Sequence, residues 1–262
     1  MARFCPLFSG SSGNCLYVGT GESGLLIDAG VSARRIERAL LAREIAPNSI
    51  SAVLVTHEHN DHVSGLRVLC KKLHIPVYAS EGTCAALRRY ALLEPETPCV
   101  PIAWKQTIGE FVVEVFATSH DTPFSSGYRI ALPDGRTVGV ATDLGIVTPT
   151  VREHLQGCDL IHIESNHDVR MLENGPYPYP LKRRILSDNG HLSNLACAKE
   201  LPALVKAGTT RIFLGHISKE NNMPELAYAT AQAELTACGF TENIDYVLRT
   251  APPENEGGYL VF

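Results

Sequence analysis

Residues 56–65 read THEHNDHVSG and hold three of the chain's 10 histidines, together with an aspartate and a glutamate. Imidazole nitrogen and carboxylate oxygen are ligands for zinc, manganese and iron, and a metal site needs several of them on rigid backbone. His57 and His59 are two residues apart, so on extended backbone they face the same way. Asp61 and His62 follow at the turn into a helix and can face a second ion. The spacing therefore predicts one short segment that serves two metals.

Three more candidate ligands complete a two-metal set. His120, Asp143 and His216 each end a predicted strand beside a polar turn. Glu58 lies between two histidines that face the same way, so it points away from them and receives no catalytic role. The alternative interpretation, a polar surface loop at THEHNDH, does not explain these three additional strand ends.

The elements that position these residues can be read from the apolar pattern. Short apolar runs and turn residues alternate over the first quarter, which predicts a β-meander. A helix is expected from Ser32 to about Ile45, followed by the buried strand SAVLVT, which ends at His57. A helix over 63–73 and a strand over 75–80 then complete a β-α-β unit.

The second half repeats this order coarsely. Strands are expected over 111–120 and on either side of an Asp134-Gly135 hairpin turn, and later over 158–165 and 210–216. Helices are expected over 149–157, 193–207 and 224–238. We therefore predict a single α/β domain of two similar halves, 1–115 and 116–262, with two sheets packed face to face and helices outside.

Composition narrows the class of protein. At 262 residues and 45% hydrophobic, the chain can bury a full core, and its eight scattered cysteines include no C-x-x-C pair. The net charge of −5 argues against a surface that coats nucleic acid nonspecifically, although a local basic groove stays compatible with it. No run approaches the ~18 apolar residues of a spanning helix, and FCPLF is too short for a signal peptide. We expect a soluble, cytoplasmic protein without a membrane partner. The sequence pattern does not distinguish a monomer from an oligomer.

The segments THEHNDH, ATSHDT, ATDLG and LGHIS occur in the order found in metallo-β-lactamase-fold hydrolases, which the chain resembles over nearly its whole length. The resemblance implies a four-layer αββα sandwich of two mixed sheets with a binuclear centre. It assigns His57, His59 and His120 to one metal, Asp61, His62 and His216 to the other, and Asp143 as the bridge. Asp28 in LLIDAG matches the family's first motif and is expected to hydrogen-bond a ligand histidine.

Such a centre favours hydrolysis by a metal-bridging hydroxide, since two ions ~3.5–4 Å apart lower the pKa of bound water. Asp61 is expected to help position that hydroxide. The ions can be zinc, manganese or iron, because all accept these ligands. Flavodiiron relatives carry glutamate where this chain has His59, and no flavin-binding domain is appended, so neither a flavin nor oxygen reduction is expected.

The metal ligands do not distinguish one hydrolysed substrate from another, so the substrate must be inferred from residues outside the ligand set. In GPYPYPLKRRILSDNGHLSN, residues 175–194, a further histidine, His191, follows the basic run Lys182 to Arg184. Hydrolysis of a phosphodiester needs a proton for the leaving oxygen, and His191 can act as its general acid. Ribonuclease Z-like and phosphonate-pathway cyclic phosphodiesterases use an additional histidine in this way, and by that likeness Glu164 orients His191.

The combination of SGSSGN, ESNHD, this segment and GHIS resembles the WalJ/YycJ-type exonuclease-like subgroup. It implies a metal-dependent phosphodiesterase, in particular a 5′-to-3′ exonuclease on DNA. Candidate substrate contacts are Ser11, Asn14, Arg183 and Asn194.

These residues could instead have structural roles without contact to a substrate. SGSSGN can be a plain hairpin turn instead of an anion-binding nest, the basic run can be a solvated helix face, and His191 can simply precede a helix cap. The main alternative function is a thioester or lactone hydrolase of the glyoxalase II kind. A metal-stabilised binding protein without activity would be expected to lack a ligand, and none of the seven is missing.

Overall fold

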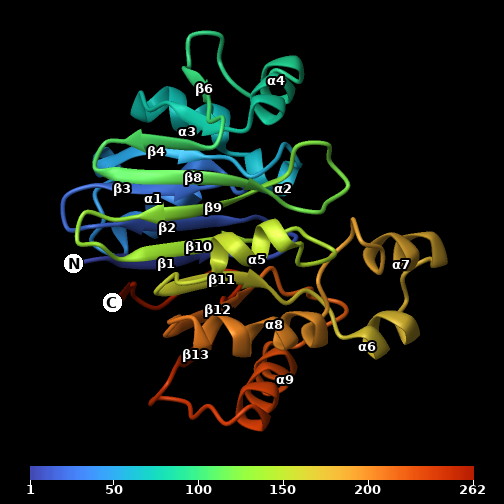
Figure 1. Ribbon diagram of the computed structural model, residues 1–262. Helices are drawn as coiled ribbons and strands as arrows, with labels where there is room; N and C mark the ends of the chain where they lie inside the picture. The colour runs from blue at the N-terminus through green and yellow to red at the C-terminus, as the bar shows by residue number, and fades with distance from the viewer. The chain divides into compact units, whose positions relative to one another are not determined.

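Short, mostly buried strands alternate with helices along the computed structural model, which describes residues 1–262. The chain forms two units (Figure 1). The first contains Met1–Val115, Ile130–Arg136 and Pro252–Phe262, and the second contains Phe116–Arg129 and Thr137–Ala251. The chain first leaves the first unit between residues 115 and 116. Two segments of the second half of the sequence, Ile130–Arg136 and Pro252–Phe262, belong to the first unit.

A seven-stranded mixed sheet belongs to the first unit, in the order β14-β1-β2-β3-β4-β5-β6. Its strands are β1 Arg3–Phe8, β2 Cys15–Gly19, β3 Gly24–Ile27, β4 Ile50–Leu54, β5 Val77–Ala79, β6 Cys99–Pro101 and β14 Leu260–Val261. β1, β2 and β3 pair antiparallel, which confirms the predicted meander, and β3 to β6 are parallel. β14, which the sequence did not predict, pairs antiparallel with β1.

The helices of the first unit are α1 Ala33–Leu41, the 3-10 helix η1 Pro47–Ser49, α2 Asn60–Val63, α3 Leu66–Leu73 and α4 Glu81–Arg89. Two predicted helices are shorter than expected. α1 stops at Leu41 because Glu44 adopts a left-handed φ of 57° and the amide of Ile45 donates back to the Leu40 carbonyl over 3.0 Å. The helix over 63–73 is divided at Gly65, whose backbone passes so close to Val31 that a Cβ would lie 2.0 Å from its carbonyl oxygen.

The second sheet has the order β13-β12-β11-β10-β9-β8-β7. Its strands are β7 Lys105–Ile108, β8 Phe111–Ala117, β9 Ser126–Ala131, β10 Thr137–Ala141, β11 Leu160–Glu164, β12 Arg211–Gly215 and β13 Val247–Thr250. β10 to β13 run parallel, whereas β7 and β8 are antiparallel. The predicted hairpin turn is present: Gly135 has a φ of 83°, and its amide donates to the Leu132 carbonyl over 3.0 Å.

The helices of the second unit are α5 Pro149–Leu155, α6 Val169–Asn174, α7 Tyr179–Ile185, α8 Asn194–Lys206 and α9 Pro224–Ala237. Ser193 caps the N-terminus of α8, since its side chain accepts from the Ala196 amide, as expected from the sequence. α8 and α9 pack against each other, and Figure 1 shows α6 and α7 side by side past the end of β11. α6 and α7 were not predicted, because each is under eight residues and prolines surround them.

Each unit encloses a core of its own. That of the first unit includes Phe8, Leu26, Ile36, Val53 and Leu69. That of the second is built from side chains of β10 to β12 and of α5, α8 and α9, among them Ile161, Ile163, Leu201, Leu214 and Leu235. No helix is both long and apolar enough to span a membrane.

Candidate metal and catalytic centre

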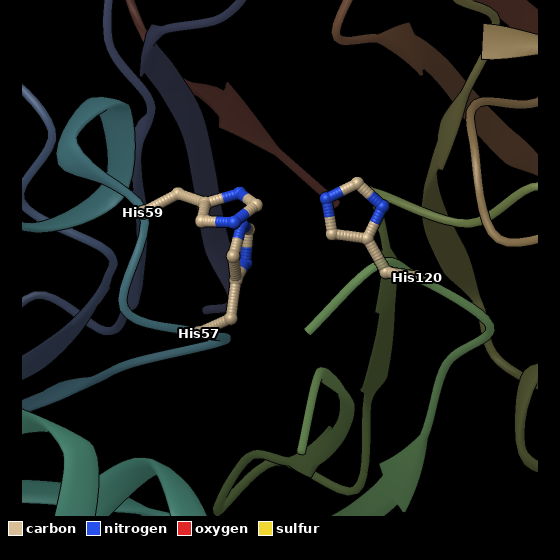
Figure 2. A group of neighbouring side chains, drawn as sticks. All are labelled: His57, His59 and His120. Atoms are coloured by element: carbon tan, nitrogen blue, oxygen red, sulfur yellow. The ribbon is translucent and has the colours of Figure 1, made fainter. Parts of the chain in front are cut away.

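The first unit presents its candidate ligands on the loop that follows β4. His57 is fully buried, and its Nδ1 lies 3.0 Å from the hydroxyl of Thr56. The rings of His57 and His59 stand edge to face with their centroids 4.5 Å apart, as Figure 2 shows, and the ring of His62 lies 4.1 Å from that of His57. Three imidazoles are therefore gathered at the end of one buried strand.

A buried carboxylate orients one of these rings. Asp28 Oδ2 lies 2.7 Å from Nδ1 of His62, and Asp28 Oδ1 also accepts from the backbone amide of Thr56 over 2.8 Å. Burial raises the pKa of Asp28, and the neighbouring His62 opposes that rise. Since a carboxylate only accepts hydrogen bonds, His62 must carry its proton on Nδ1, which leaves Nε2 as an electron-pair donor. This is the contact that the sequence predicts for Asp28.

The loop SGSSGN positions Asp61 and His62 from the other side. Asn14 is 6% exposed, its backbone amide donates to the Asp61 carbonyl over 2.8 Å, and its side-chain nitrogen lies 3.1 Å from Nε2 of His62. The amide of Gly30 donates to the Asn14 carbonyl, and a Cβ at Gly30 would lie only 1.7 Å from the Asp61 carbonyl oxygen. Asn14 thus packs inside this loop, whereas Ser11 is exposed.

Glu164 organises the second unit. It ends β11 with no exposed surface, and its Oε1 lies 2.9 Å from Nδ1 of His191 and 2.6 Å from Nδ1 of His216. Its Oε2 accepts from the backbone amides of Leu144, over 3.1 Å, and Leu192, over 2.9 Å. One carboxylate therefore holds the loops that contain Leu144, His191 and His216. It orients His191, as the family resemblance implies, and also His216.

The pKa values of this group follow from the same contacts. Burial would raise the pKa of Glu164, but the two histidines lower it to about 2. Burial would lower the pKa of His191, but the carboxylate of Glu164 raises it above its ordinary value. For His120, burial lowers the pKa, and the neighbouring carboxylates, of which Asp143 contributes most, oppose that fall without reversing it. His191 is consequently a histidine that can keep a proton to donate.

Asp143 and His120 stand beside this group. Asp143 Oδ1 lies 3.3 Å from Nδ1 of His216 and 3.8 Å from both Nδ1 of His191 and Nε2 of His120. The Nδ1 of His120, whose ring is also drawn in Figure 2, lies 3.1 Å from the Gly190 carbonyl. Asp143, Glu164, His191 and His216 offer donor atoms that all lie within 4.8 Å of one another. Of these four, Asp143 and His216 are the predicted ligands, and their carboxylate oxygen and imidazole nitrogen suit a divalent metal ion.

Backbone strain marks the same places. Asp28, Asp143 and His216 have φ values of 63°, 56° and 50°, in the left-handed region that non-glycine residues rarely adopt. Each comes directly after, or one residue beyond, the end of a strand. Such residues cost on the order of 1–3 kcal/mol and cluster at functional sites.

A buried amide network ties the loops of the second unit together. Asn194 and Asn222 exchange two side-chain hydrogen bonds of 2.8 Å, and Ser165 Oγ donates to Asn194 over 2.7 Å. Asn166 donates to the His216 carbonyl over 2.8 Å. Asn194 is 3% exposed, so its side chain serves this network, whereas the sequence proposed it as a substrate contact.

The basic run lies on α7. Lys182 Nζ donates to the Glu173 carbonyl over 2.7 Å, and the guanidinium of Arg184 pairs with Asp121. The side chain of Arg183 is exposed and forms no hydrogen bond or ion pair within the chain. The amide of His191 donates to the carbonyl of Ile185, the last residue of α7, over 3.0 Å. The basic helix and His191 are therefore held together.

Comparison with known proteins decides the family. Residues 24–217 match the β-lactamase superfamily domain. The chain is 40% identical over 240 residues to exodeoxyribonuclease YycJ of Bacillus anthracis, which covers 91% of this chain and 90% of that protein. It is 35% identical over 256 residues to exodeoxyribonuclease WalJ of Streptococcus pneumoniae, at 96% and 95% coverage. The chain belongs to the YycJ/WalJ family of the β-lactamase superfamily.

Solved structures agree on the fold of this YycJ/WalJ family member. The metallo-β-lactamase fold protein YhfI of Bacillus subtilis superposes with a TM-score of 0.73 at 16% identity, over 97% of each chain. The predicted resemblance, the α/β sandwich of two mixed sheets and the predicted class of enzyme, a metal-dependent hydrolase, are thereby confirmed.

Three residues with structural roles at the site were missed by the sequence reasoning. Thr56 links Asp28 to His57, Asn222 completes the amide network, and Asp121 pairs with Arg184. Thr56 and Asp121 are next to predicted ligands in the sequence, and this position could have indicated their roles. No feature of the sequence around Asn222 indicates its role, since its partners lie 28 to 57 residues away.

Proposed function

We propose that this chain is a metal-dependent nuclease that hydrolyses phosphodiester bonds of DNA from the 5′ end towards the 3′ end. The observation that carries the proposal is the contact of Glu164 with both His191 and His216, because it holds a histidine of raised pKa beside candidate metal ligands. Support for the substrate comes from the family, whose members YycJ and WalJ are named exodeoxyribonucleases.

The ligand pattern of the sequence supports two divalent ions, with zinc, manganese and iron as the candidates. His57, His59 and His120 would hold one ion, Asp61, His62 and His216 the other, and Asp143 both. When bound, such ions lower the pKa of water and offset the charge of a phosphoryl group.

The chain's own groups provide orientation and proton transfer. Asp61 is 28% exposed and can accept a hydrogen bond from the attacking water. His191 is 19% exposed and can reach a substrate, and it donates its proton to the leaving oxygen. Glu164 keeps that proton on the ring by stabilising the charged imidazolium. Arg183 has an exposed side chain that could bind a phosphate of the substrate strand.

The test is His191→Ala with His74→Asn as the matched control. His74 is an exposed histidine in a left-handed conformation that asparagine also adopts. General acids contribute typically ~10²–10⁴-fold where the leaving oxygen is an alkoxide, so turnover of a DNA strand should fall at least ~100-fold while metal content stays at the wild-type level. Unchanged turnover would remove His191 from the mechanism.

Substrate and direction need a separate assay. Metal-reconstituted protein is incubated with 5′-labelled and 3′-labelled DNA, with RNA, and with a lactone and acyl-glutathione. Release of the 5′ label as short products while the 3′-labelled strand shortens gradually is expected on DNA. Hydrolysis of the thioester or lactone alone would favour a hydrolase of the glyoxalase II kind instead.

A further inference from the structure

Arg184 is held at the site by a carboxylate on a neighbouring segment. Its Nε and Nη2 both pair with Oδ2 of Asp121. The other oxygen of Asp121 lies 3.2 Å from Nε2 of His120. On its other side Arg184 adjoins Ile185, whose carbonyl accepts from the amide of His191. The arginine therefore links the segment of His120 to that of His191, whose rings are 5.2 Å apart.

The same segments are joined a second time, so the position of Arg184 does not depend on one ion pair. Ser119 donates its hydroxyl to the Asp188 carbonyl, and its own carbonyl accepts from the amide of Gly145 over 2.8 Å. Ser119, next to His120, is thus bonded to Asp188 in the loop that follows α7 and to Gly145 in the loop that contains Asp143. A guanidinium fixed in this way loses little conformational freedom when it binds a ligand.

Arg184 has N–H donors that are free to bind an anion. Guanidinium has five N–H donors, and the Nη1 group of Arg184 makes no hydrogen bond in the chain. Its side chain is 53% exposed, whereas that of Asp121 is 28% exposed. The two other cations of the basic run lack this combination, because Lys182 is bonded to a carbonyl and Arg183 has no anchor.

We propose that Arg184 binds a nonbridging oxygen of the scissile phosphodiester and that Asp121 is its positioning residue. The inference rests on the proposed nuclease function. A phosphodiester whose leaving oxygen is protonated by His191 must lie against that ring, and Arg184 is the anchored cation on the helix whose last carbonyl accepts from the His191 amide. Planar, paired N–H donors suit phosphate oxygens, and a donor aimed at developing charge acts in a partly desolvated site.

The variants Arg184→Ala and Arg184→Lys test the assignment, with Lys206→Ala as control. Lys206 is an exposed cation at the far end of α8, 12 residues and about 18 Å along the helix from Asn194. On bis(4-nitrophenyl) phosphate, which contains only a scissile phosphodiester, Arg184→Ala should lower kcat/KM by about 10²-fold. Arg184→Lys should be intermediate, since it keeps the charge without the fork, and Lys206→Ala should equal wild type.

Binding gives a readout that needs no turnover. In EDTA, a 12-nucleotide single-stranded DNA labelled with fluorescein at its 3′ end is titrated at several salt concentrations. Loss of one phosphate contact in Arg184→Ala should reduce the slope of log Kd against log salt by about 0.7, and Lys206→Ala should leave it unchanged.

Asp121→Asn separates positioning from charge. If Asp121 acts through Arg184, this change lowers kcat/KM several-fold in the wild-type background and has no further effect beside Arg184→Ala. Additive losses would overturn the positioning role.

Two outcomes distinguish this inference from the proposed function. If wild-type protein hydrolyses no phosphodiester, the proposed function fails first. If wild type is active and Arg184→Ala matches it on the small substrate, the inference fails alone, including the case in which only DNA cleavage suffers and the arginine contacts a flanking phosphate.

Discussion

Replacing Glu164 by glutamine changes one buried atom and should cost much of the stability of the protein. The carboxylate receives four donors, the two histidine Nδ1 groups on Oε1 and the amides of Leu144 and Leu192 on Oε2. The NH₂ of glutamine must face one of these pairs, because both oxygens are already used as acceptors. Two hydrogen bonds are lost, and two buried donors are left without an acceptor.

The magnitude follows from the penalty for buried unpaired donors, about 1–3 kcal/mol each. Glu164→Gln should therefore lower the free energy of unfolding by about 2–6 kcal/mol, a large share of the ~5–15 kcal/mol of an ordinary protein. Glu200→Gln is the matched control. Glu200 pairs with Arg152 through two contacts of 2.8 Å, but the two side chains are 19% and 39% exposed, and such pairs contribute only about 0–1 kcal/mol.

Urea unfolding followed by far-ultraviolet circular dichroism, with a chelator present at neutral pH, measures both variants without contributions from bound metal. A loss at Glu164→Gln below about 1 kcal/mol, equal to that of Glu200→Gln, would refute the reasoning. It would mean that these loops hold their places without the carboxylate.

Two further changes probe the loops around the candidate ligands. Gly30→Ala places a methyl group against the Asp61 carbonyl. It should weaken zinc or manganese binding in calorimetric titration by ~10-fold or more, because it displaces the backbone that orients candidate ligands. Gly258→Ala, which has open space around it, should bind metal like wild type, and equal affinities of the two variants would contradict this reasoning. Asn222→Asp directs an acceptor at three oxygens that now receive its N–H groups and should lower the unfolding free energy by about 3 kcal/mol or more, while the exposed Asn243→Asp should be neutral in the same urea experiment. A small effect at Asn222 would show that water replaces the network.

Much of the fold could be predicted because its strands are short, buried and followed by polar residues. The end of β4 at His57 is an example: an apolar run stops where three histidines begin, and parallel strands bring such ends to one edge of a sheet. The pairing of Asp28 with His62 was predictable only through family resemblance, since the two residues are 34 positions apart. Spacing alone does not reveal which aspartate accepts from which ring.

The segment around α7 shows where sequence reasoning fails. Its prolines and short length resemble a loop, and nothing local indicates that Arg184 meets Asp121, 63 residues earlier. The substrate contacts proposed at Asn14 and Asn194 have the same weakness. A polar residue in a Gly-rich or Ser-rich loop can serve a ligand or the loop itself, and only the tertiary contacts show that both asparagine side chains are occupied.

The left-handed conformations of Asp28, Asp143 and His216 also bear on how this fold can evolve. Glycine adopts such φ values without strain, so replacing any one of the three would relieve on the order of 1–3 kcal/mol while removing a polar side chain. The relief is set against the buried contacts that these side chains make, since each polar group left without its partner costs about 1–3 kcal/mol. A strained residue that is kept at such a position therefore indicates that its side chain is needed, and a relative with glycine at all three positions would be expected to have lost the activity.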